Sequence, residues 1–183
     1  NDDHFPSSRF NPVPQADQAT PLVIAKAGMR IVSITQVHNE VRRGNLSRFL
    51  TNLKPLVDEM VIYDDASTDG SWPLIQAATA HATRGLKNDF LNERTIRQQL
   101  LDKAIALKAD FVLWLDADET LPPHSREQLH HAATWCLEQG YDGVALHEWN
   151  LWRSDSWRRV DNKYDDGWFV RLWRVTPQLK FSA

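Results

Sequence analysis

The sequence has a single cysteine, no long apolar run and almost no excess charge. Its 183 residues hold 21 Lys and Arg against 24 Asp and Glu, a formal net charge of −3. One cysteine, Cys136, excludes an internal disulfide and a cysteine-rich zinc site, and it suits a reducing compartment. Nucleic-acid binding by bulk charge needs clustered Lys and Arg, whereas here the basic residues are interspersed with acidic ones.

No stretch approaches the roughly 20 apolar residues that are needed to span a bilayer. The segment before Met29 also lacks the basic start and apolar centre of a signal peptide. We therefore expect no transmembrane segment, no nucleic-acid partner and a cytoplasmic location. Peripheral contact with a membrane stays compatible with this composition.

Tryptophan is the residue that the chain has in excess, with eight copies, five of them from Trp149 to Trp173. An indole face packs against the apolar C–H face of a sugar ring, so the cluster favours a carbohydrate acceptor. A small core under a long loop or an interface with a partner explains the cluster equally well.

Strand and helix patterns alternate from Met29 onward. Short β-branched or apolar runs predict strands, and apolar residues at helical spacing predict the helices between them. The expected strands cover residues 30–35, 60–63, 111–115, 143–147 and 168–173. This alternation predicts a single α/β domain, residues 29–183, with a mainly parallel sheet flanked by helices. Residues 1–28, proline-rich and polar, are expected to form an extended arm.

Polar clusters follow three of the expected strands, at residues 36–40, 64–69 and 116–119. Ligands of parallel sheets bind at the carboxyl ends of the strands, so neighbouring strands would bring the clusters into one site. Asp116 and Asp118 offer hard oxygen ligands for Mg²⁺ or Mn²⁺, which in turn bridge the phosphates of a diphosphate. On this motif alone, a simple turn cap is about as probable.

Two further positions have both a simple and a functional interpretation. The acidic loop at residues 64–69 is by itself best read as an Asx turn, although an aspartate fixed there could accept the N–H of a uracil. Arg97 would ordinarily be a surface arginine, but its planar, permanently charged guanidinium suits a phosphate. Asn39 and Glu40 can equally cap the helix that is expected near Asn45.

Taken in order, these segments resemble a known family. They read Val-Ser-Ile-Thr-Gln-Val-His-Asn-Glu at 32–40, Val-Ile-Tyr-Asp-Asp-Ala-Ser-Thr-Asp-Gly-Ser at 61–71, then Arg97, then Leu-Trp-Leu-Asp-Ala-Asp-Glu at 113–119. The set resembles family 2 glycosyltransferases, whose GT-A fold is Rossmann-like. Phe-Val-Arg-Leu-Trp-Arg at 169–174 is similar to a strand of relatives that modify bacterial surface glycans.

By position, the resemblance implies a nucleotide-sugar site and a metal site. Residues 36–39 match the segment that lines the nucleotide base, and Asp65 matches the aspartate that contacts uracil. The implied nucleotide-sugar site comprises Gln36, Val37, His38, Asn39, Glu40, Asp65, Arg97, Asp116 and Ala117. The implied metal ligands are Asp118 and Asp116. Relatives usually carry Pro at position 36 and Tyr or a similar residue at position 38. They also have another strand between positions 81 and 92, which residues 86–90 represent poorly.

The implied enzyme is a glycosyltransferase of the hexosyltransferase class. It would use Mn²⁺ or Mg²⁺ to move a sugar from a nucleoside diphosphate sugar, UDP-linked, to a glycan or other hydroxyl acceptor, with inversion. Asp165 and Asp166 are the candidate catalytic bases, although a turn explains them as well. Glu148 is a third, less favoured candidate. Relatives place an acidic motif after the strand at 169–174, and we find no certain counterpart, so the domain can be incomplete at its C-terminus.

Two other classes of function compete with sugar transfer. A nucleotidyltransferase would use the same metal and nucleotide chemistry, but a Gly-rich phosphate loop normally follows its first strand, and residues 36–40 contain no glycine. A non-catalytic module that binds nucleotides or glycans would need no base.

Overall fold

The computed structural model describes residues 10–12, 28–88, 92–151, 157–159 and 167–181. The chain divides into two compact units, a smaller one of residues 1–22 and 145–170 and a larger one of residues 23–144 and 171–183. The larger unit contains the three clusters that the sequence singled out. Within the described ranges, no helix has both the length and the apolar character needed to cross a membrane.

Among the described residues, one sheet of six strands has the order β4-β3-β2-β5-β8-β6. Its strands are β2 (Ile31–Val37), β3 (Glu59–Asp64), β4 (His81–Arg84), β5 (Phe111–Trp114), β6 (Gly143–Glu148) and β8 (Gly167–Arg174). Strand β2 pairs in parallel with β3 and β5, and β3 pairs in parallel with β4. Strand β8 runs antiparallel to β5. The predicted α/β fold with a mainly parallel sheet is confirmed.

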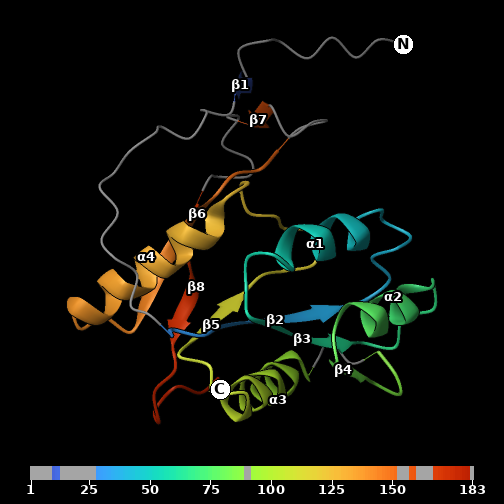
Figure 1. Ribbon diagram of the computed structural model, residues 1–183. Helices are drawn as coiled ribbons and strands as arrows, with labels where there is room; N and C mark the ends of the chain where they lie inside the picture. The colour runs from blue at the N-terminus through green and yellow to red at the C-terminus, as the bar shows by residue number, and fades with distance from the viewer. Residues whose placement is uncertain (1–9, 13–27, 89–91, 152–156, 160–166, 182–183) are drawn as a thin grey trace. The chain divides into compact units, whose positions relative to one another are not determined.

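In the described part of the chain, four helices accompany the sheet: α1 (Leu46–Leu53), α2 (Ser71–Ala78), α3 (Glu93–Ala106) and α4 (Ser125–Glu138). Figure 1 shows α1 and α3 on opposite sides of β2. The apolar positions of α1 recur at helical spacing and are all buried, as predicted. On the other side, Ile96, Leu100, Leu101 and Ala104 of α3 form one core with Val32, Ile34, Val61 and Val112 of the strands.

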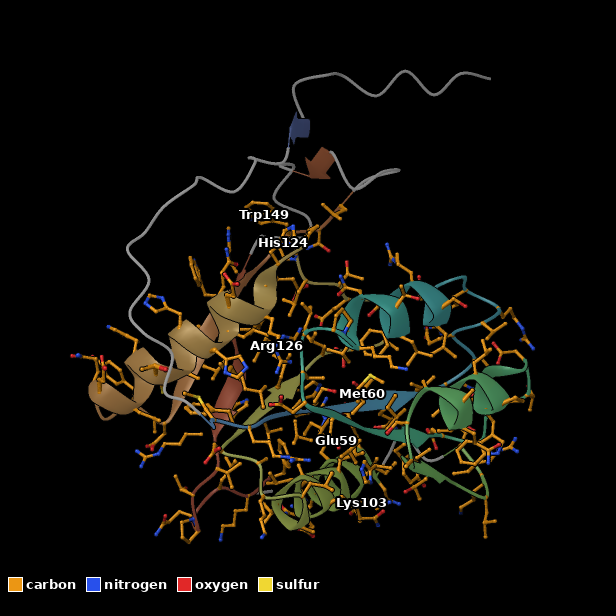
Figure 2. All side chains as sticks on the ribbon, in the orientation of Figure 1. Glu59, Met60, Lys103, His124, Arg126 and Trp149 are labelled. Carbon is orange, nitrogen blue, oxygen red and sulfur yellow. The ribbon has the colours of Figure 1, made fainter. Side chains whose placement is uncertain are left out.

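The segment after α2 differs from the sequence prediction. The sequence offers Ser71 as the N-cap of a helix that reaches about His81, but in the structure Gly70 is the N-cap and the helix ends at Ala78. Thr79 is extended, and its hydroxyl donates to the main-chain oxygen of Met60, 2.6 Å away (Met60 is labelled in Figure 2). His81 therefore begins β4, which lies within residues 81–92, where the resemblance expects a further strand.

The smaller unit holds a two-stranded sheet that was not predicted. Strand β1 (Phe10–Pro12) pairs antiparallel with β7 (Trp157–Arg159), joining residues far apart in the sequence. A three-residue strand shows no alternation long enough to detect by pattern, which explains why the segment looked like a plain arm. The boundary at residue 28 stays a prediction.

Candidate active site

The carboxyl ends of β3, β2 and β5 lie beside one another. Strand β2 is between the other two and parallel to both, with Val37 opposite Asp64 and Ile34 opposite Trp114. The polar clusters that follow these strands therefore emerge at one edge of the sheet, in the same compact unit. This is the convergence that the sequence predicted.

Asp65 is the centre of the first group of contacts, and it is fully buried. The side-chain amides of Gln36 and Asn88 both donate to its Oδ2, at 3.3 and 3.1 Å. Nδ1 of His38 lies 2.7 Å from the main-chain oxygen of Asp65, and Nε2 lies 2.8 Å from the amide nitrogen of Asn39. These contacts assign the proton of the His38 ring to Nδ1.

Asn39 connects the end of β2 to the loop after β3 by hydrogen bonds. Its φ of 56° is in the left-handed region, which asparagine tolerates better than most residues. Its side-chain oxygen accepts the N–H of Thr68 at 2.8 Å, and its own N–H donates to the Ser67 hydroxyl at 2.9 Å. The main-chain oxygen of Val37 accepts the N–H of Asp65. Residues 36–39 are thus held in a fixed conformation against Asp65.

Glu40 has its hydrogen-bond partners outside this group. Its buried carboxylate accepts from Arg43 and from the side chain of Asn45, both at 2.8 Å. Its main-chain oxygen accepts the N–H groups of Asn45 and Leu46, where α1 begins. This geometry favours the helix-capping interpretation, and contact between Glu40 and a nucleotide stays a prediction.

A small pocket lies between the end of β2, the end of β5 and α3. Its lining residues are Ile34, Thr35, Gln36, Glu93, Arg97, Leu100, Trp114 and Asp116. Arg97 forms an ion pair with Glu93, and burial lowers the pKa of its guanidinium while the charges of Glu93 and Asp116 raise it. An arginine stays charged at neutral pH even so. Three of the predicted nucleotide-site residues, Gln36, Arg97 and Asp116, therefore meet in one pocket.

In the loop after β5, the two aspartates of the Asp-x-Asp pair have different surroundings. The indole Nε1–H of Trp114 donates to Oδ1 of Asp116 at 3.2 Å, and Nη1 of Arg171 lies 3.8 Å from Oδ2. Ala117 is buried. Asp118 is exposed, and the structure gives its carboxylate no hydrogen bond or ion pair within the described ranges. Its main-chain oxygen accepts from Arg48 at 3.2 Å.

The donor set fits a metal only in part. Among the described residues, no three His, Cys, Asp or Glu side chains are arranged to hold an ion by themselves. An accessible carboxylate such as Asp118 suits Mg²⁺ or Mn²⁺ when the ion is also bound to phosphate oxygens and water. Asp116 is already engaged by Trp114 and Arg171, so the two carboxylates are not equivalent.

The candidate bases and Arg171 remain to be placed in the structure. Asp165 and Asp166, the candidate bases, lie outside the described residues. Arg171 of β8 has a place in the site that the sequence reasoning did not assign, because its partners are more than 50 positions away. The available signal was the Arg-Leu-Trp-Arg segment, which was noted without a role.

Comparison with known proteins gives a consistent result. A family model described as Glycosyl transferase family 2 matches residues 34–146. The chain is 32% identical over 139 residues to an undecaprenyl-phosphate 4-deoxy-4-formamido-L-arabinose transferase of Aeromonas hydrophila subsp. hydrophila. That alignment covers 72% of this chain and 40% of the relative, so the chain spans less than half of that relative's length.

Solved structures share the fold. Crystal structures of S. aureus TarS, one in complex with UDP and one with UDP-GlcNAc, match this chain with a TM-score of 0.51 and 21% identity. The matches cover 69% of this chain and 37% and 36% of those chains. The arrangement of strands and helices described above is therefore found in glycosyltransferases with the GT-A fold.

Proposed function

Because the chain belongs to glycosyl transferase family 2, we propose that it transfers a sugar from a UDP-linked donor to an acceptor hydroxyl, with a divalent metal and with inversion. The observation that carries the proposal is the meeting of Asp65, Arg97 and the Asp116–Asp118 loop at the carboxyl edge of one parallel sheet. Base, phosphate and metal chemistry are each represented there by a separate group.

Asp65 is the proposed contact for uracil. Its Oδ2 already accepts two amide N–H groups, from Gln36 and Asn88, so the oxygen is oriented to accept an N–H. The N3–H of uracil is a donor of the same kind, and exchange of one amide for it would keep the buried carboxylate satisfied. Gln36, where relatives usually carry proline, would adjust its side chain as the base enters.

Asp118 and Arg97 are the proposed contacts for the diphosphate. A bound Mg²⁺ or Mn²⁺ would neutralise charge that develops on the departing diphosphate. Asp118 would hold the ion from the protein side, because its carboxylate is accessible. Arg97 would face the phosphates from α3 with a fixed positive charge, since Glu93 and the Trp114 ring hold its guanidinium in the pocket.

The transfer itself is a single displacement at the anomeric carbon. The acceptor oxygen forms the new bond from the side opposite the diphosphate, which leaves with the electron pair of the broken C–O bond. A carboxylate takes the acceptor proton. Asp165 and Asp166 remain our candidates for that base.

The smaller unit supports a carbohydrate acceptor. Trp168 is 71% exposed. The ring of His147 stacks on its indole, with the ring centroids 4.8 Å apart and an angle of 16° between the ring planes. The indole N–H of Trp149 donates to Nδ1 of His147 at 2.7 Å, which fixes the orientation of the imidazole. A flat aromatic surface next to hydrogen-bonding groups is suited to a sugar ring. The Aeromonas relative is named for a polyprenyl phosphate acceptor, so the acceptor assay should include that class.

The location that we propose is the cytoplasm, on the argument from Cys136 alone.

The test of the function is to incubate the protein with metal, acceptor and a panel of UDP- and GDP-sugars and to identify the products. Sugar transfer predicts free UDP and a glycosylated acceptor. Pyrophosphate from a nucleoside triphosphate would instead indicate a nucleotidyltransferase, and binding without any product would indicate a binding module.

A further inference from the structure

Arg171 approaches the Asp116–Glu119 loop from the antiparallel strand. In the register of β5 and β8, Leu113 is opposite Leu172 and Val112 is opposite Trp173. Continuing this register by one residue places Arg171 opposite Trp114. Residues opposite one another in a sheet project from the same face, so Arg171 shares the face of Trp114, on which α3 packs.

Among the described residues, two carboxylates pair with the guanidinium of Arg171. It forms an ion pair with Oε1 of Glu119, and its Nη1 lies 3.8 Å from Oδ2 of Asp116. The other carboxylate oxygen of Glu119 accepts the main-chain N–H of Asp116 at 2.8 Å. Arg171, Glu119 and Asp116 are therefore connected by these contacts, and the Arg171 side chain is only 18% exposed.

The positive charge of Arg171 offsets repulsion among the neighbouring carboxylates of the loop. Three carboxylates at positions 116, 118 and 119 lie within four residues, and like charges so close repel one another. Arg171 is the cation that the structure places against two of them. The nearby Arg97 forms its ion pair with Glu93, although its charge also acts on Asp116, and Arg48 donates to the main-chain oxygen of Asp118.

We propose that Arg171 is a positioning residue for the metal and diphosphate site. It holds Asp116 and Glu119 through their carboxylates, whereas the carboxylate of Asp118 is exposed and has no hydrogen bond or ion pair within the described ranges. The inference rests on the proposed function, because it gives the loop its metal-binding conformation. Loss of Arg171 would release Asp116 and Glu119 without touching Asp65 or the groups around it.

The test is calorimetric titration of the protein with UDP, in Mn²⁺ and separately in a chelator. R171M should weaken UDP binding in Mn²⁺ by about tenfold or more, as expected for loss of a charge-assisted contact, and should leave binding in chelator within about twofold. R171K should recover part of the affinity, because an ammonium restores the charge but not the planar fork. R174M is the matched control, since Arg174 is on the same strand and, three residues on, faces the other side.

Each outcome decides the inference. Equal losses in Mn²⁺ and chelator, or wild-type affinity in both, would overturn it, and so would an effect of R174M as large as that of R171M. If R171M does not fold, R171K decides: affinity in Mn²⁺ equal to wild type in a folded R171K overturns the inference.

D118N separates this inference from the proposed function. If wild type binds UDP more tightly in Mn²⁺ and D118N abolishes the difference while R171M does not affect it, only the role of Arg171 fails. If wild type shows no metal-dependent binding, the metal step of the proposed function fails together with the inference.

Discussion

The guanidinium carbon of Arg97 lies 3.5 Å from the centroid of the Trp114 ring, and the same indole donates its N–H to Asp116. Trp114 thus connects the cation of α3 with the first carboxylate of the loop after β5. A cation held against an aromatic face in a pocket contributes about 0.5–2 kcal/mol. The indole therefore sets the positions of two charges in the proposed diphosphate site.

Substitutions of Trp114 separate these two contacts. W114F keeps an aromatic face for Arg97 but loses the donor to Asp116, whereas W114L loses both. We expect UDP affinity in Mn²⁺ to fall by about threefold in W114F and by about tenfold or more in W114L, on the energies of a neutral hydrogen bond and a cation–π contact. W135F, on the exposed face of α4, is the control. Unchanged affinity in W114L would contradict the role of Trp114.

Asp65 should determine affinity for the uracil base. D65A removes the acceptor for the N3–H and should cost about 1–3 kcal/mol of UDP binding, the usual penalty for an unpartnered buried group. Because the base contact needs no metal, the loss should be similar in Mn²⁺ and in chelator. D102A, at an exposed position of α3, is the control. Wild-type UDP affinity in a folded D65A protein would refute the assignment.

Asp58 should make the fold sensitive to acid. Burial alone would raise the pKa of this carboxyl, but hydrogen bonds from the Ile31 N–H at 2.8 Å and from Arg126 at 2.6 Å outweigh burial, so the pKa lies below 3.8 (Arg126 is labelled in Figure 2). A lowered pKa in the folded state stabilises the protein above the unfolded value, and this stability is lost as pH falls through the folded value.

Thermal melts across this pH range test the prediction. D58N should lower the melting temperature at neutral pH, and the difference from wild type should shrink as pH falls below 3.8. D102N should melt like wild type throughout. A constant difference between D58N and wild type at every pH would mean that the ionised form of Asp58 contributes nothing.

Trp168 should act on the acceptor and not on the donor. W168A removes the exposed ring on which His147 stacks, and we expect the KM for a carbohydrate acceptor to rise by about tenfold, the scale of a sugar-stacking contact. UDP affinity should be unchanged. W135A is a matched control, because Trp135 is also an exposed tryptophan. An equal rise of the acceptor KM in both variants would assign the effect to general surface changes.

The sequence predicts the strands that end in the site because each is an apolar run followed by an abrupt polar cluster. Residues 111–115 are the clearest case, since a run this apolar must be buried and the aspartates must follow where it leaves the core. Strand β4 was missed because its sequence, His-Ala-Thr-Arg, is short and polar, and its place at the sheet edge depends on pairing with β3. Pairing partners are not encoded in a local pattern.

The partners of individual side chains could not be predicted in the same way. The contact of Arg171 with Glu119 spans 52 positions and depends on the β5–β8 register. Glu40 shows the opposite case, because its partners Arg43 and Asn45 are local and the helix-capping interpretation was available from the sequence. Sequence patterns identified the edge of the sheet, and tertiary pairing decided which side chains at that edge are engaged.

The most direct test of metal-dependent sugar transfer at this sheet edge is the rate of UDP release from a UDP-sugar by wild type, D118N and D102N, with acceptor, in Mn²⁺ and in chelator. We expect release by wild type and D102N in Mn²⁺ only, and a rate at least about a hundredfold lower for D118N, as expected when a metal ligand is lost. Equal rates for D118N and wild type, or no release of UDP by wild type in Mn²⁺ from any UDP-sugar, would contradict the account.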